Sequence, residues 1–240
     1  DGTNQNVLAD SYYNLEIDGS GTKTSQGTVT VAGDMKVNSG GAVYDVGTGN
    51  ATTVTGTSDI DGEVVTSSGT YTANGSSDID GTVTISTGTY DANGSSDIDG
   101  TISITGTGKY DADAAFDATS GNVTFTGAGR LECSNTVTSL GTLSTSAGTV
   151  EYDGGTQDVL ADAYYNLEID QSGVKTSQGT VTAAGTMTVQ TGATYAVAAT
   201  TTTVTGTSDI DGTTTISTGT YNADGSSDVD GTISITGTGK

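Results

Sequence analysis

The sequence predicts an all-β chain folded as a parallel β-helix, or β-solenoid, and three observations support this: a fixed repeat, an alternation within it and a lack of proline. The repeat is marked by Asp59, Asp78 and Asp97, and again by Asp209 and Asp228. Each interval is 19 residues (78 − 59, 97 − 78 and 228 − 209). Self-similarity at a period near 20 residues is typical of solenoids, in which each repeat forms one coil.

Apolar and polar residues alternate within the repeat unit 76–94. Ile79 is flanked by aspartates, Val83 and Ile85 by hydroxyl residues, and Tyr90 is separated from Ala92 by Asp91. A period of two predicts strands with one buried face. Each coil is therefore expected to hold three short strands, and 240 residues at roughly 19–21 per coil give about 12 coils. The usual chirality of parallel crossovers predicts a right-handed helix.

The predicted corners are Gly81, Gly88 and the pair Asn93-Gly94. Glycine and asparagine suit corners because both tolerate a positive φ. Asn-Gly is also a strong hairpin signal, so an antiparallel meander is the alternative. The constant strand order and inward residue type favour stacked coils. One inward column is predicted to contain Tyr71, Tyr90, Tyr110, Leu131, Val150, Tyr195 and Tyr221.

The lack of proline fits strands that are paired on both sides. None of the 240 residues is proline, and a proline would remove a donor from a ladder. Hydrophobic residues make up 32% of the chain and aromatic residues 5%, which is low but sufficient for a thin core between neighbouring coils. A Gly-, Ser- and Thr-rich disordered linker has a similar composition. The regular alternation argues against that alternative.

Five segments follow one another along a predicted single continuous solenoid. They are a first cassette (1–56), three Asp-Ile-Asp-Gly coils (57–113), degenerate coils (114–150), a second copy of the first cassette (151–206) and two further Asp-Ile-Asp-Gly coils (207–240). The second copy is offset by 152 residues, from Val7 to Val159 (159 − 7). Because the sequence starts and stops within the pattern, we expect a fragment of a longer repeat chain.

Two of these segments are less regular. In the first cassette, alternation runs from Tyr13 through Leu15 to Ile17, and residues 19–26 are expected to form a polar corner. In the degenerate segment the expected inward residues are Phe116, Val123, Phe125, Leu131, Val137, Leu140, Leu143 and Val150.

The charge of the chain limits its partners. The formal net charge is −23, with six Lys and Arg residues and no His. Binding to a nucleic-acid backbone is therefore excluded, because few basic groups exist to replace counterions. Cations or basic partners are favoured. Cys133 is the only cysteine, so no internal disulfide framework is expected. There is also no apolar run long enough to insert into a membrane.

One stretch resembles a known kind of repeat. Residues 12–37 contain Tyr-Tyr-Asn-Leu-Glu-Ile, then Gly-Thr-Lys-Thr and Gly-Thr-Val-Thr-Val-Ala-Gly-Asp-Met-Lys-Val, and this pattern recurs at 164–189. It resembles repeats of very large secreted bacterial β-strand-repeat surface proteins, of the autotransporter and filamentous-haemagglutinin-like type. The resemblance implies a secreted, cell-surface fibre or adhesin, with surface glycans or cell-surface molecules as candidate partners. It brings no catalytic residues.

The candidate site consists of two outward aspartate columns. Carboxylates at one offset in stacked coils lie about 4.8 Å apart, so a divalent ion such as Ca²⁺ could bridge them through oxygen ligands. The alternative is a solvated acidic face that prevents lateral aggregation. The candidate ligands are Asp59, Asp61, Asp78, Asp80, Asp97, Asp99, Asp209, Asp211, Asp228 and Asp230.

We expect a structural protein rather than an enzyme. The chain has no His and a single Arg, Arg130, and its carboxylate pairs recur in every Asp-Ile-Asp-Gly coil, whereas a catalytic pair is needed once. The expected function is an extracellular fibre, filament or sheath, with head-to-tail stacking of coils of like chains. The alternatives are an adhesin stalk whose binding tip lies elsewhere, a polysaccharide-active enzyme, or an ice-binding protein. The last would use outward threonine rows, namely Thr82, Thr84, Thr101, Thr213, Thr215 and Thr232.

Overall fold

The protein is a parallel β-solenoid, as the sequence predicts. The computed structural model describes residues 3–240, with the side chain of Thr145 excepted. These residues form 36 strands and no helix. Three strands make one coil, so the chain contains about 12 coils. It divides into two compact units. Unit 1 comprises the residues up to Arg130 together with Thr138–Ser144, and unit 2 comprises Leu131–Val137 and Thr145–Lys240.

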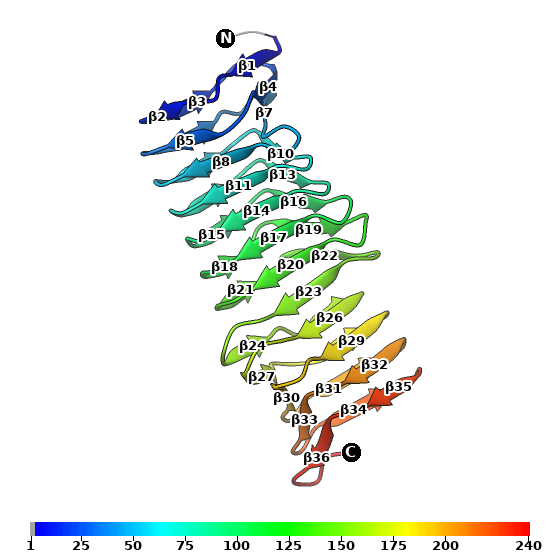
Figure 1. Ribbon diagram of the computed structural model, residues 1–240. Coiled ribbons are helices and arrows are strands. Elements are labelled where there is room, and N and C mark those ends of the chain that lie inside the picture. Colours follow the sequence, from blue (N-terminus) through cyan, green and yellow to red (C-terminus); the bar gives the residue numbers. More distant parts are fainter. Residues whose placement is uncertain (1–2) are drawn as a thin grey trace. The chain divides into compact units, whose positions relative to one another are not determined.

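Unit 1 contains three parallel sheets, in which strands of successive coils lie side by side (Figure 1). The β1 sheet is β1 (Gln5–Val7), β4 (Gly21–Ser25), β7 (Ala42–Asp45), β10 (Glu63–Thr66), β13 (Thr82–Ile85), β16 (Thr101–Ile104) and β19 (Asn122–Phe125). The β2 sheet is β2 (Ser11–Tyr12), β5 (Val29–Val31), β8 (Ala51–Val54), β11 (Thr70–Ala73), β14 (Thr89–Ala92) and β17 (Lys109–Ala112). The β3 sheet is β3 (Leu15–Ile17), β6 (Met35–Val37), β9 (Ser58–Ile60), β12 (Ser77–Ile79), β15 (Ser96–Ile98) and β18 (Phe116–Asp117).

In unit 2, strands of successive coils again lie side by side in three parallel sets, each named by its first strand within the unit. The β23 sheet is β23 (Thr149–Tyr152), β26 (Asn166–Ile169), β29 (Thr186–Val189), β32 (Thr207–Ile210) and β35 (Ser227–Val229). The β24 sheet is β24 (Gln157–Val159), β27 (Gly173–Ser177), β30 (Ala193–Val197), β33 (Thr213–Ile216) and β36 (Thr232–Ile235). The β25 sheet is β25 (Ala163–Tyr164), β28 (Val181–Ala183), β31 (Thr201–Val204) and β34 (Thr220–Ala223). Strands β20 (Arg130–Cys133), β21 (Val137–Ser139) and β22 (Thr142–Thr145) lie where the chain divides.

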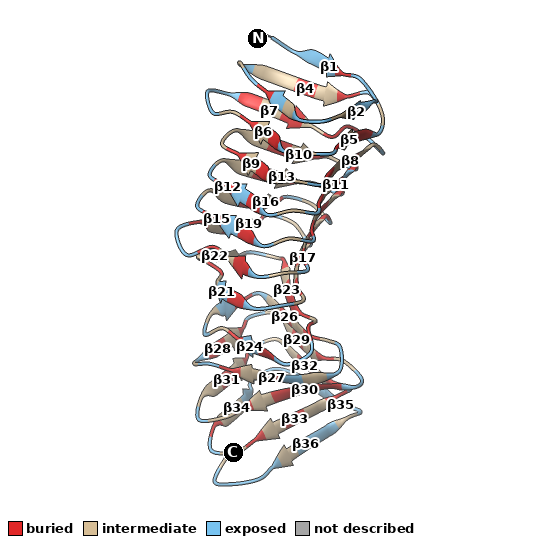
Figure 2. Ribbon diagram, turned by 90° about the vertical axis from the view of Figure 1, so that its left-hand side faces the viewer, coloured by how far each residue is buried: buried red, intermediate tan, exposed pale blue. Residues whose placement is uncertain are grey.

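The alternation of the sequence becomes an inner and an outer face on most strands, whereas the last strands, β34–β36, are largely exposed (Figure 2). In β13, Val83 and Ile85 are fully buried, and the threonines between them are only partly covered. Ile79 is buried between two outward aspartates. The degenerate segment follows the expected pattern except at Leu143, which is half-buried. The inward residues therefore pack on their counterparts in the next coil, which is how a thin solenoid core is built.

Tyrosine rings stack along the interior of unit 1. The ring centroids of Tyr71 and Tyr90 are 4.8 Å apart with an interplanar angle of 13°, and those of Tyr90 and Tyr110 are 5.0 Å apart at 6°. Each hydroxyl contacts the buried serine that precedes the Asp-Ile pair. The pairs are Tyr71–Ser58, Tyr90–Ser77 and Tyr110–Ser96, at oxygen–oxygen distances of 2.9, 3.0 and 2.9 Å. The buried hydroxyls thus satisfy one another inside the core.

The expectation of one tyrosine column through the whole chain is wrong. Tyr195 lies in β30, in register with Lys175 and Thr214, whereas Tyr221 lies in β34, in register with Thr202. Two different strands of the coil carry inward tyrosines, and both follow a glycine, so sequence spacing alone could not separate them. In the first cassette, Tyr13 is 79% exposed rather than inward, because the strand begins only at Leu15.

Glycine is needed at the Asp-Gly corners for a reason other than the expected positive φ. Gly81 and Gly100 are not among the residues with a positive φ, which occurs instead at first-cassette corners such as Gly40, with φ of 90°. A Cβ on Gly81 would overlap the carbonyl oxygen of Gly62, and one on Gly100 would overlap that of Gly81. Successive coils thus approach too closely at this corner for any side chain.

Replacing Gly81 by Ala is expected to destabilise the fold by about 1–3 kcal/mol, the range typical of overpacking, because the backbone of two coils must separate. The matched control is Gly155→Ala, where an added Cβ has no atom within 4 Å. Urea denaturation of both variants measures the difference. Equal stability of the two variants would contradict the close approach of the coils.

Candidate functional site

The first aspartate column predicted from the sequence is present. Asp59, Asp78 and Asp97 lie in register on β9, β12 and β15, and Asp117 on β18 extends the column. Asp209 and Asp228 are in register on β32 and β35 of unit 2. The sequence pattern therefore places these carboxylates correctly.

The second predicted column lies just beyond the strand ends. Asp61, Asp80 and Asp99 each follow an inward isoleucine and precede a glycine. Asp211 and Asp230 hold the equivalent places in unit 2. These carboxylates sit at the Asp-Gly corner, where a Cβ on the glycine would overlap the backbone of the preceding coil. Whether either column binds a divalent ion stays a prediction.

Lys36 lies beside the first aspartate of each column in unit 1, which was not predicted from the sequence. Its strand β6 pairs with β9, so that Lys36 is in register with Asp59. The ammonium nitrogen lies 2.5 Å from Asp59 Oδ2 and 2.9 Å from Asp61 Oδ2. These hydrogen bonds and charges raise the pKa of Lys36 above its usual value. The 19-residue period does not reveal that Lys36 and Asp59 are in register, because this coil is 23 residues long (59 − 36).

Farther along the columns, like carboxylates of successive coils lie beside one another. The pKa of Asp78 is raised, first by loss of solvent and then by the charges of Asp80, Asp59 and Asp97. The pKa of Asp209 is raised in the same way, by loss of solvent and then by neighbouring aspartates. Two like charges about 4.8 Å apart repel by about 0.9 kcal/mol in the dielectric of water. The columns are thus regions where added positive charge would be favoured.

A different group of carboxylates is drawn together in unit 2. Among the residues that the structure describes, Glu151, Glu168 and Asp170 are the one group of three acidic side chains whose oxygens all lie within 4.8 Å of one another. Glu151 and Glu168 are in register on β23 and β26, and Glu168 also accepts a hydrogen bond from Gln190 at 2.7 Å. Oxygen ligands of this kind suit a hard cation. The sequence analysis missed the group because the register offset here is 17 residues (168 − 151).

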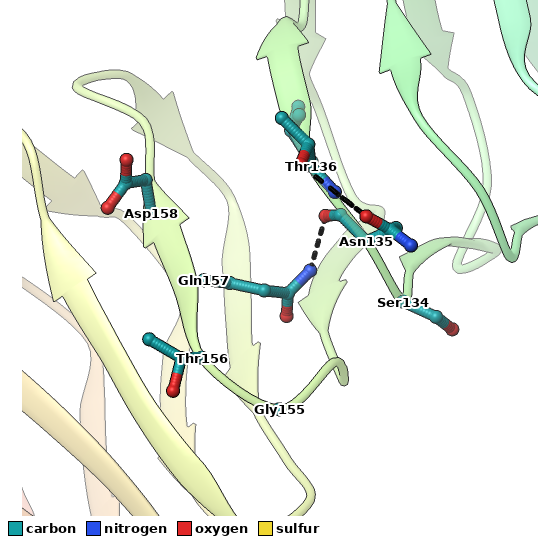
Figure 3. Close-up of a pocket in the computed structure, with 8 residues that line it drawn as sticks. Ser134, Asn135, Thr136, Gly155, Thr156, Gln157 and Asp158 are labelled. Atoms are coloured by element: carbon teal, nitrogen blue, oxygen red, sulfur yellow. Dashed lines mark hydrogen bonds between the residues drawn. The ribbon is translucent and has the colours of Figure 1, made fainter.

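A polar pocket of about 510 Å³ lies beside β24, wholly within unit 2. Figure 3 shows Gln157 extending across it from β24 toward Asn135. The Gln157 amide nitrogen donates to the carbonyl oxygens of Cys133 at 2.8 Å and Asn135 at 2.6 Å, and its oxygen accepts from Gly154 N at 2.7 Å. Gln157 therefore holds the segment after β20 beside the start of β24, next to the backbone hydrogen bond from Asp153 N to Cys133 O at 3.2 Å.

Two lysines of the predicted polar corners are buried. Lys23 donates to the carbonyl oxygens of Gly19, Ser20 and Gly21 at 2.9, 2.8 and 3.2 Å. Its counterpart Lys175 donates to the carbonyl oxygens of Asp170 and Gln171. Burial lowers the pKa of Lys175, which the charges of Asp170 and Asp153 partly oppose. Both ammonium groups hold the preceding loop, which is a structural role.

No protein-family model, curated protein or solved structure that was compared with the chain matches it. The described residues, 3–240, contain no helix that could cross a membrane. What the site can do must therefore be inferred from its own residues.

The aspartate columns predict that stability depends on pH. Because the folded-state pKa values of Asp78 and Asp209 are raised, these groups favour folding most below their unfolded pKa near 3.8. Their contribution is lost as the pH rises through the folded pKa. Asp78→Asn should therefore stabilise the fold at pH 7. The gain should be less than about 1 kcal/mol, because solvent screens the repulsion between Asp78 and its neighbouring carboxylates. At pH 3.5 the substitution should have little effect.

Thermal unfolding across this pH range, followed by circular dichroism, measures the effect. Asp224→Asn is the matched control, because the repeat itself has asparagine at the equivalent positions Asn74 and Asn93. A stabilisation by Asp78→Asn that is the same at pH 3.5 and pH 7 would contradict repulsion within the column.

Proposed function

We propose that the chain is a structural repeat segment of an extracellular surface fibre, filament or sheath. The observation that carries the proposal is the repetition of like residues in register on successive coils. Tyr71 is in register with Tyr90 on the next coil, and Asp78 is in register with Asp97, because the strands that hold them are paired. A coil of this kind can be added or removed without changing the contacts that its neighbours make. Such equivalence is what a molecule that spans distance requires.

The packing supports a role as a spacer. Each coil buries its apolar residues against the coils before and after it, so stability is approximately a sum over neighbours. Every coil adds about 4.8 Å to the stack. The buried tyrosine–serine pairs add directional contacts that fix the register. The fold thus provides a defined length and a regular spacing of side chains, and a spacer of this kind needs no catalytic site.

The outer face supports a second part of the proposal, that ions control association between copies. Each copy carries a net charge of −23, and neighbouring aspartates add to the effect of lost solvent in raising the pKa values of Asp78 and Asp209. Bare columns of two copies would repel each other, which limits lateral aggregation. Divalent ions such as Ca²⁺ would neutralise the columns through oxygen ligands and permit lateral or head-to-tail self-association.

Immunogold electron microscopy of the source cells, with antibodies against this chain, tests the proposal. We expect label along filaments or a layer at the cell surface, and loss of that order in samples treated with a calcium chelator. Magnesium added back in the presence of the chelator is the control for ion type. Label confined to the cell interior would contradict the surface role, and ordered filaments that survive chelation would contradict the role of calcium alone.

A further inference from the structure

The β24 sheet has an open edge at the pocket. Within the part of the chain that the structure describes, β24 pairs with β27 and has no strand on its other side. Most strands elsewhere in the solenoid have a partner on each side. An edge strand leaves a row of backbone donors and acceptors without ladder partners, which is a template for an added strand.

The hydrogen bonds of β24 show which backbone groups face the pocket. Val159 O accepts from Gln178 N at 2.9 Å, so Val159 faces β27. In a parallel ladder, alternate residues direct both the N–H and the C=O to the same side. Gln157 therefore faces β27 as well, and the backbone groups of Thr156 and Asp158 face the open side.

The space beside this edge suits a short extended segment. The pocket of about 510 Å³ is bounded by Thr156 and Asp158 on one side and by Ser134 and Thr136 on the other. The three residues of β24 span about 10 Å, so three or four residues of an added strand fit along it. The Gln157 amide is already hydrogen-bonded to the backbone. It therefore forms the floor of the pocket and leaves the strand edge available.

We propose that the β24 edge binds an extended peptide segment of a partner protein that carries lysine or arginine side chains. The peptide would pair with Thr156 and Asp158 as an added strand, in which main-chain hydrogen bonds give affinity and alternate side chains give specificity. Charge complementarity selects a basic partner: Asp158 is exposed at the rim, and the chain has a net charge of −23. The hydroxyls of Thr136 and Thr156, both exposed, complement small polar side chains between the basic ones.

The test uses the whole chain and a fluorescent peptide, acetyl-Thr-Lys-Thr-Lys-Thr-amide, with binding followed by fluorescence anisotropy at 0.15 M salt. Its matched partner has the same side chains but N-methyl groups at both lysines and at the threonine between them, which removes N–H donors from both edges of the added strand and keeps the charge. We expect the unmodified peptide to bind at least tenfold more tightly. Amide hydrogen exchange at Thr156 and Asp158 should also slow when it binds.

Two variants distinguish binding of the peptide at the β24 edge from non-specific attraction of a basic peptide to an acidic protein. Asp158→Asn should weaken binding several-fold, while the amide oxygen can still accept the 2.7 Å hydrogen bond from Gln178. Asp224→Asn removes the same charge at an exposed corner outside the aspartate columns and the pocket, and should leave binding unchanged. Equal binding of the N-methylated peptide, equal weakening by both variants, or no binding at millimolar peptide would each overturn the proposal.

Discussion

The structure depends on one constraint, the close and constant spacing that parallel backbone hydrogen bonds impose on successive coils. Any residue at a fixed position in the coil must tolerate its counterpart about 4.8 Å away. Aromatic rings meet this condition by stacking, as Tyr71 and Tyr90 do at 4.8 Å. At the Asp-Gly corner there is no room for a side chain, because a Cβ on Gly81 would overlap the carbonyl oxygen of Gly62. The repetitive sequence is the result of this constraint.

The same spacing has opposite consequences inside and outside the coil. Inside, identical residues gain contact with one another, and buried hydroxyls such as Tyr90 and Ser77 satisfy each other. Outside, identical carboxylates repel, and Lys36 pairs with Asp59 and Asp61, the first members of the aspartate columns in unit 1. An acidic outer face therefore opposes association between copies unless ions intervene. The proposed surface role and its dependence on ions both follow from that balance.

The sequence predicts what repeats and fails where the repeat changes. The 19-residue period and the alternation correctly place Ile79 inside, Asp78 outside and the three strands of each coil. They do not reveal the burial of Lys23, because only the folded loop brings three carbonyls to its ammonium group. They also miss the open edge of β24 and the group around Glu151, where irregular coil lengths alter the register.

Deletion of one whole coil shows whether the coils are equivalent and stack in register. Removing residues 76–94 joins Gly75 to Ser95 and restores the repeat, whereas removing residues 76–85 leaves half a coil. If the coils are equivalent, the first deletion keeps a cooperative thermal transition within a few degrees of the parent, and the second loses it. A chain that tolerates both deletions equally, or neither, would contradict stacking of equivalent coils.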